Sequence, residues 1–163
     1  MEDRDYLYGK RILIVDDEPD ILDTLEELLP MCDVAKASSS EEAKKLLEIN
    51  YFDIAVLDIM GVDGYKLLDI TKQRGVIAVM LTAHALSTED TVRSFKEGAA
   101  SYIPKEEMLN ITTYLNDILE AKEKGEHIWW RWLDRFADYY SRKFTPDWKE
   151  KDKEFWERFP FHM

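Results

Sequence analysis

The sequence predicts an α/β protein in which helices cover both faces of a parallel β-sheet. Two observations lead to this prediction. Five short strand candidates recur along roughly the first 120 residues, and all but Asp33–Ala37 are the apolar runs expected of strands buried on both faces. Each run is followed by a segment whose apolar residues recur at helical spacing. Alternating strands and helices build a parallel sheet, because each crossover helix returns the chain to the same edge.

The strands expected in the first half end at charged or turn residues. They are expected at Arg11–Val15, Asp33–Ala37 and Ile54–Leu57. Leucines at helical spacing follow the first strand and stop at Pro30, because proline cannot continue a helix. Ser40 precedes two glutamates and is expected to cap the second helix.

The second half continues the same alternation. Glycines mark the turn after the third strand, and a short helix is expected to begin near Tyr65. Gly98 is expected to end the fourth helix, since glycine is favoured just beyond a helix C-terminus. The other expected elements are strands at Val76–Leu81 and Ala100–Ile103, and helices at Thr88–Glu97 and Glu106–Lys124.

The composition divides the chain near Gly125. Residues 1–124 carry 14 basic and 26 acidic residues, which accounts for the whole net charge of -12. Residues 125–163 carry 8 of each and contain all five tryptophans. We therefore expect an α/β domain at residues 1–124 and an aromatic-rich extension at residues 125–163.

Charge and composition exclude several classes of protein. A net charge of -12 disfavours a broad nucleic-acid-binding surface. No run approaches the roughly 20 apolar residues that span a bilayer, and the acidic start lacks the features of a signal peptide. The single cysteine, Cys32, allows no internal disulfide and no cysteine-based metal site. A cytoplasmic location is expected.

Polar residues gather where the strands end. Asp16 and Asp17 follow the first strand, Asp58 follows the third, Thr82 follows the fourth, and Lys105 follows the fifth. In a parallel sheet these positions meet at the carboxyl edge, where ligands of open α/β sheets bind. The sequence therefore predicts one functional site at this edge.

These residue types suit the transfer of a phosphoryl group. Carboxylates crowded together repel one another, and a hard divalent cation such as Mg²⁺ relieves the repulsion. The lysine ammonium and the threonine hydroxyl can neutralise or hydrogen-bond phosphoryl oxygens. Asp58 is the natural nucleophile, because an aspartate can form an acyl phosphate.

Four motifs surround these residues: IVDDEPD at Ile14–Asp20, VLDIMGVDGYKLL at Val56–Leu68, MLTAHA at Met80–Ala85 and GAASYIPKE at Gly98–Glu106. In this order they resemble the receiver domain of two-component response regulators, over about residues 10–122. The resemblance implies a flavodoxin-like fold with strand order 2-1-3-4-5.

The resemblance also implies roles for single residues. Asp58 would accept a phosphoryl group from a histidine kinase or a phosphotransfer protein. Asp16, Asp17, Asp58 and the backbone carbonyl of Met60 would bind Mg²⁺ or Mn²⁺. Thr82, Lys105 and the backbone of Ala83 would contact the phosphoryl oxygens, and Tyr102 would be the aromatic residue that switches together with Thr82.

The chain departs from the usual family pattern after Asp58. Only four residues separate Asp58 from Asp63-Gly64, two fewer than the family usually has. Lys105 is followed by Glu106, whereas the family lysine is usually followed by proline. Neither change removes a chemical group from the predicted site.

Two other kinds of protein share part of this chemistry or fold. An aspartyl-phosphate phosphohydrolase uses similar groups but has a second aspartate two residues after its nucleophile, where this chain has Met60. The second alternative is an interaction scaffold that keeps the fold but is not phosphorylated. Loss of the acidic pair Asp16 and Asp17, or of Lys105, would favour it, and all three residues are present. A turnover enzyme is not expected, but a phosphoacceptor with limited self-phosphorylation and self-dephosphorylation activity is.

Aromatic residues recur at helical spacing in the extension. One stripe includes Trp129, Trp132 and Phe136, and a second includes Trp148 and Trp156. Thr145 and Pro146 are typical of a helix start between them, so a helical hairpin is expected. Two short helices cannot form a core alone, so the aromatic surface should pack on the receiver-like domain, on a second copy of the chain, or on a downstream protein.

Overall fold

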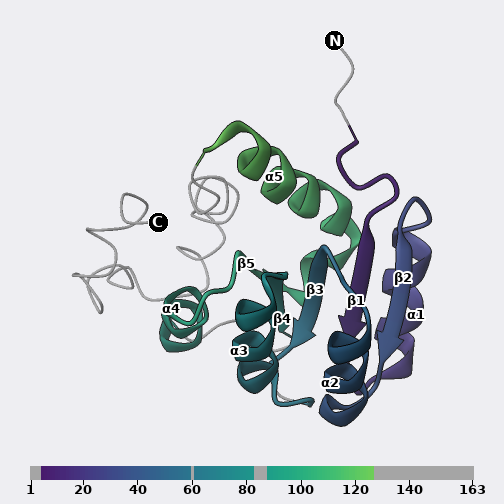
Figure 1. Ribbon diagram of the computed structural model, residues 1–163, viewed down its shortest axis with the longest axis vertical. Helices are drawn as coiled ribbons and strands as arrows, with labels where there is room; N and C mark the ends of the chain where they lie inside the picture. The colour runs from purple at the N-terminus through teal and green to yellow at the C-terminus, as the bar shows by residue number, and fades with distance from the viewer. Residues whose placement is uncertain (1–4, 60, 83–87, 127–163) are drawn as a thin grey trace.

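The computed structural model describes residues 5–59, 61–82 and 88–126 of the chain. Within them, a five-stranded parallel sheet has the order β2-β1-β3-β4-β5. Helices lie on both faces of the sheet: Figure 1 shows α2 and α3 in front of it and α1 behind it. The predicted fold class and strand order are therefore confirmed. The predicted hairpin lies outside the described residues.

The strands agree with the apolar runs of the sequence to within one or two residues at each end. They are β1 (Arg11–Val15), β2 (Asp33–Ala37), β3 (Ile54–Asp58), β4 (Ile77–Thr82) and β5 (Ser101–Pro104). Every residue of β3 and β5 is buried, as expected of strands covered on both faces. β3 and β4 each include the polar residue that the sequence placed just beyond them, Asp58 and Thr82.

The helices alternate with the strands as expected. They are α1 (Pro19–Leu28), α2 (Ser40–Ile49), α3 (Gly64–Arg74), α4 (Thr88–Lys96), the 3₁₀ helix η1 (Lys105–Asn110) and α5 (Ile111–Lys124). Pro19 occupies the first turn of α1, where its missing N–H costs no hydrogen bond. None of the helices in the described part of the chain combines the length and the apolar character required to cross a membrane.

The predicted cap of α2 was wrong by one residue. Ser39, not Ser40, is the N-cap: its backbone is extended, and its hydroxyl accepts a 3.2 Å hydrogen bond from the N–H of Glu42. The N-cap oxygen reaches the third residue of the helix, so the serine three positions before Glu42 fits this geometry. Ser40 is already helical.

The predicted helix at Glu106–Lys124 was wrong in its first turn. This turn is the separate 3₁₀ helix η1, which buries none of its residues. Met108 of η1 packs against the core while only partly buried, and full burial begins at Ile111 and continues through Leu115, Ile118 and Leu119. Spacing in the sequence does not separate a short 3₁₀ turn from the α-helix that follows it.

One hydrophobic core joins the sheet to the helices. Its largest fully buried side chains include Tyr102, Phe52 and Phe95. Leu7, which precedes β1, is also completely buried. The backbone around it is held by bonds from Tyr6 N–H to Asn116 Oδ1 at 2.8 Å and from Gly9 N–H to the Met31 carbonyl at 2.9 Å. The segment before β1 is therefore part of the folded domain.

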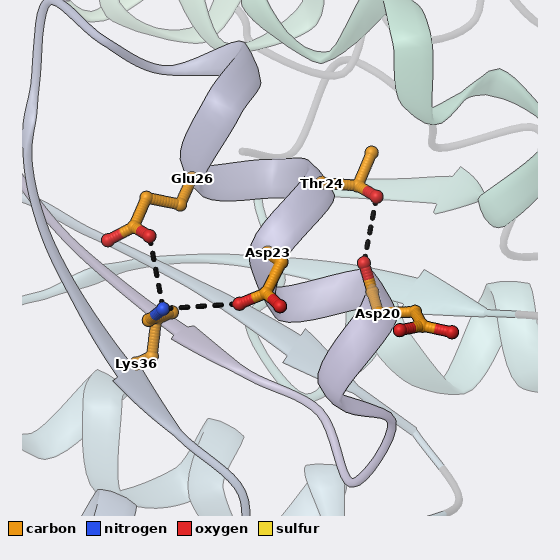
Figure 2. Close-up of polar contacts among 5 residues, drawn as sticks. All are labelled: Asp20, Asp23, Thr24, Glu26 and Lys36. Atoms are coloured by element: carbon orange, nitrogen blue, oxygen red, sulfur yellow. Dashed lines mark hydrogen bonds and ion pairs between the residues drawn. The ribbon is translucent and has the colours of Figure 1, made fainter.

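An ion-pair cluster ties α1 to the edge strand β2 (Figure 2). Lys36 Nζ on β2 lies 3.2 Å from Asp23 Oδ1 and 3.0 Å from Glu26 Oε1, both on α1. The hydrogen bonds to these two carboxylates raise the pKa of Lys36. Thr24 Oγ1 also donates a 2.8 Å bond to the Asp20 carbonyl within α1. These contacts join β2 to the helix that begins just after Asp16 and Asp17.

Candidate functional site

Four strand ends place polar residues at one edge of the sheet. Asp16 directly follows β1, Asp58 ends β3, Thr82 ends β4 and Lys105 directly follows β5. The parallel register sets Asp58 opposite Leu81, and Thr82 opposite Pro104. Parallel strands with this register end together, so residues far apart in the chain become neighbours.

Lys105 is the centre of the site. Its Nζ lies 2.8 Å from Asp16 Oδ2 and 3.5 Å from Asp58 Oδ1. The lysine side chain is 10% exposed, and the side chains of Asp16 and Asp58 are 1% and 8% exposed. Glu18, whose side chain is largely exposed, has Oε1 3.7 Å from the same ammonium group. This ammonium group is thus shared by two buried carboxylates and one exposed one.

The site carries more negative than positive charge. Burial raises the pKa of Asp16, and the negative charge of Asp58 adds to this effect against the opposing influence of Lys105. For Lys105, burial acts to lower the pKa, but the hydrogen bond to Asp16 and the charges of Asp16, Asp58 and Glu18 raise it overall. The Asp16 shift is therefore mainly an effect of burial, whereas the Lys105 shift reflects the several carboxylates around one ammonium group.

A divalent cation fits this donor set. Asp16, Asp17 and Glu18 each offer a carboxylate oxygen, and these oxygens lie within 4.8 Å of one another. Asp16 is buried, whereas Asp17 and Glu18 are exposed. Hard oxygen donors around an excess of negative charge are what Mg²⁺ and Mn²⁺ require, and an exposed side leaves room for the waters that Mg²⁺ keeps.

Two backbone N–H groups after β3 donate hydrogen bonds that hold the loop together. Gly61 N–H donates a 3.2 Å hydrogen bond to Asp58 Oδ2, and Gly64 N–H donates a 3.1 Å bond to the Ile59 carbonyl. Asp63 adopts a left-handed conformation with φ 54° just before α3. The sequence marked Gly61 only as a turn residue. The short interval after Asp58 was the available signal that this loop is unusually tight.

Thr82 and Tyr102 are both buried. Thr82 is 4% exposed at the end of β4, and Tyr102 is completely buried in β5, paired in register with Met80 of β4. Met60 and Ala83, which the resemblance assigned to metal and phosphoryl contacts, lie outside the described residues. Glu18, which the sequence did not assign to the site, lies beside Lys105.

Comparison with known proteins gives a consistent result. Residues 12–116 match the family model of the response regulator receiver domain. The chain is 36% identical over 103 residues to the two-component response regulator ARR18 of Arabidopsis thaliana, which covers 60% of this chain and 16% of that protein. It is 37% identical over 97 residues to the heme response regulator HssR of Staphylococcus aureus, covering 57% of this chain and 43% of that protein. The chain therefore spans less than half the length of these relatives.

Solved structures show the same fold. A CheY-like receiver domain protein from Methanospirillum hungatei is 34% identical, with a TM-score of 0.65 over 72% of this chain and 98% of that one. The response regulator DrrB, an OmpR/PhoB homolog from Thermotoga maritima, is 25% identical, with a TM-score of 0.60 over 72% of this chain and 54% of that one.

Proposed function

The chain belongs to the response regulator receiver domain family, and from this premise we propose that Asp58 accepts a phosphoryl group in a two-component phosphorelay. One observation carries the assignment of the residue. Asp58 lies at the carboxyl edge of the sheet within 3.5 Å of Lys105, whose ammonium also contacts Asp16. A carboxylate beside a cation and a pair of acidic residues has the surroundings that phosphoryl transfer requires.

In the proposed step, an Asp58 carboxylate oxygen attacks the phosphorus of the donor. The new oxygen–phosphorus bond forms as the bond between phosphorus and the leaving group breaks, and the leaving group keeps the electron pair. Lys105, next to Asp58 Oδ1, then offers positive charge to the phosphoryl oxygens. The hydroxyl of Thr82 and the backbone N–H of Ala83 are proposed as further donors to these oxygens.

Asp16, Asp17 and Asp58, with the backbone carbonyl of Met60, are proposed to hold Mg²⁺ or Mn²⁺. Such an ion, when bound, neutralises carboxylate and phosphoryl charge during the transfer. The oxygen-rich, negatively charged donor set around Asp16 supports this assignment. The hydrogen bond from Gly61 N–H meanwhile restricts the rotation of the Asp58 carboxylate.

Thr82 and Tyr102 are proposed to convert phosphorylation of Asp58 into a change in side-chain packing. Both are buried, on neighbouring strands, and the register places Thr82 two positions beyond the partner of Tyr102. A hydroxyl drawn toward a new phosphoryl group would alter the space available to the tyrosine ring. Coupling of a local charge to a packing change is a common form of molecular switch.

The proposed donor is a histidine kinase or a phosphotransfer protein. The proposed output is protein–protein contact through the extension at residues 125–163, with Trp129, Trp132, Phe136, Trp148 and Trp156 at the interface. A second copy of the chain or a downstream protein would supply the other side. The clustered aromatic residues in a segment of neutral net charge support this assignment over binding to nucleic acid.

Mass spectrometry after incubation with Mg²⁺ and acetyl phosphate tests the phosphoacceptor. We expect one added phosphoryl group that requires the metal and is absent from the Asp58→Ala variant. Exposed Asp69 on α3 provides a matched control, because Asp69→Ala should leave the adduct unchanged. No adduct on the intact chain, with no stabilisation by beryllofluoride, would favour an interaction scaffold that is not phosphorylated.

A further inference from the structure

Two glycines after β3, Gly61 in the loop and Gly64 at the first position of α3, have no conformational requirement for glycine. Four of the described glycines adopt positive φ values, namely Gly9, Gly75, Gly98 and Gly125, but Gly61 and Gly64 do not. Any residue could adopt their backbone conformation without left-handed strain. Glycine at these two positions is therefore explained by the lack of room for a side chain, not by a left-handed backbone conformation.

The space beside Gly61 is occupied by the carboxylate of Asp17. A Cβ atom built on Gly61 would lie 2.3 Å from Asp17 Oδ1, 2.4 Å from its Cγ and 2.5 Å from its Oδ2. These distances are far below van der Waals contact, so a methyl group and this position of Asp17 exclude each other. The same glycine donates its N–H to Asp58 Oδ2 at 3.2 Å. Gly61 therefore contacts two of the three carboxylates assigned to the metal.

We infer that Gly61 is a positioning residue of the metal site, whose missing side chain lets the short loop close while Asp17 keeps its place beside Asp16. The inference rests on the proposed function, since it deepens the role of Asp17. Only four residues separate Asp58 from Asp63, and the loop backbone at Gly61 lies close to Asp17. In this loop a side chain at position 61 would occupy the volume that the metal-binding carboxylate needs.

The geometry predicts that a substitution at Gly61 changes metal affinity but leaves the stability of the fold nearly unchanged. The atoms that clash with the added Cβ form the end of an exposed aspartate side chain, which can rotate away at little cost to the fold. Gly61→Ala should therefore displace a ligand without unfolding the domain. Changing the groups that orient metal ligands usually lowers metal affinity about 10- to 100-fold.

The test measures Mn²⁺ affinity of the full chain by the electron paramagnetic resonance signal of free Mn²⁺, beside thermal unfolding without metal. For Gly61→Ala we expect Mn²⁺ binding weakened about 10- to 100-fold and a midpoint within about 2 °C of the unchanged chain. Gly75→Ala is the matched control. Its Cβ would meet nothing within 4 Å, but its φ is +71°, so the midpoint should fall by about 4 °C or more with Mn²⁺ affinity unchanged.

Equal Mn²⁺ affinity in Gly61→Ala and the unchanged chain would overturn the inference. A fall in midpoint as large as that of Gly75→Ala would also overturn it, because the clash would then lie in the loop backbone rather than at Asp17. The adduct with acetyl phosphate separates this inference from the proposed function. If the unchanged chain takes no phosphoryl group, Asp58 fails as acceptor, while the Mn²⁺ comparison still decides the role of Gly61.

Discussion

The ammonium group of Lys105 lies 2.8 Å from Oδ2 of Asp16, the most buried carboxylate of the site. Its distance to Asp58 Oδ1 is longer, at 3.5 Å. The lysine therefore forms its shorter ion pair with Asp16, which is proposed only as a metal ligand, rather than with Asp58, which is proposed as both metal ligand and phosphoacceptor. A bound metal ion and Lys105 must share the same negative charge.

Replacing Lys105 should separate metal binding from phosphoryl transfer. In Lys105→Met, loss of a neighbouring positive charge should tighten Mg²⁺ binding about tenfold, equivalent to about 1.4 kcal/mol of removed repulsion. The initial rate of phosphorylation should fall, because the phosphoryl oxygens lose a cation. Isothermal titration calorimetry and mass spectrometry measure the two effects. Lys44→Met, at an exposed position on α2, is the control, and weaker Mg²⁺ binding by Lys105→Met would contradict the prediction.

Gly64→Ala should differ from Gly61→Ala by lowering stability. A Cβ atom at position 64 would lie 2.3 Å from the Asp58 carbonyl oxygen and 2.9 Å from Ile59 Cα. Both are backbone atoms and cannot rotate away, so we expect the free energy of unfolding to fall by about 1–3 kcal/mol. Urea unfolding of both variants measures the difference. Equal stability of the two would show that the loop after β3 adjusts freely.

The segment before β1 should contribute strongly to stability. Leu7 is completely buried, although it precedes residues 12–116, which match the family model. Leu7→Ala should cost about 2–5 kcal/mol, because it removes buried methyl groups and leaves a cavity. Its neighbour Tyr8 is 80% exposed, so Tyr8→Ala should change the free energy of unfolding by no more than about 0.5 kcal/mol. Similar losses for both variants would argue against specific packing of Leu7.

The thiol of Cys32 should make stability depend on pH in the alkaline range. Burial, followed by the charges of Asp5 and Asp53, raises the pKa of this thiol to about 11. Its Sγ donates to the Leu7 carbonyl at 3.4 Å. In the unfolded chain the thiol has a pKa of about 8.5 and loses its proton first. Its contribution to stability is therefore complete below that pH and is lost as the pH rises toward the folded value.

Urea unfolding of the intact chain and of Cys32→Ala between pH 8 and pH 11 isolates this effect from the titration of lysines and tyrosines. The difference in unfolding free energy between the two should shrink as the pH rises. Alkylation of the native thiol at pH 8 should also be slower than in urea. If the difference in unfolding free energy stays constant across this pH range, folding does not raise the pKa of the thiol.

The aromatic extension should control assembly of the full chain. Trp129→Ser together with Trp132→Ser changes the stripe at helical spacing, whereas Trp130 lies off that stripe. Light scattering coupled to size exclusion should show a smaller assembly for the double variant and no change for Trp130→Ser. A monomeric intact chain before and after phosphorylation would exclude a homodimer and leave a downstream protein as the proposed partner.

The sequence by itself was sufficient for the strand–helix alternation and for the residues that follow each strand. Both depend on local patterns, because an apolar run that ends in an aspartate or lysine shows its strand and its carboxyl end together. The sheet order followed from resemblance to a family. Once parallel strands share one edge, Asp16, Asp58 and Lys105 have to meet there, so the central part of the site could be predicted.

Only the tertiary structure decided which atoms meet across those strand ends. Asp17 and Gly61 lie 44 positions apart in the chain, and their mutual exclusion depends on how closely two loops approach. Leu7 is buried because Asn116 and Met31 hold the backbone beside it, which no periodicity in its own segment indicates. Patterns of residues determine the local elements, whereas the packing of loops and segments against one another determines the distances on which the chemistry depends.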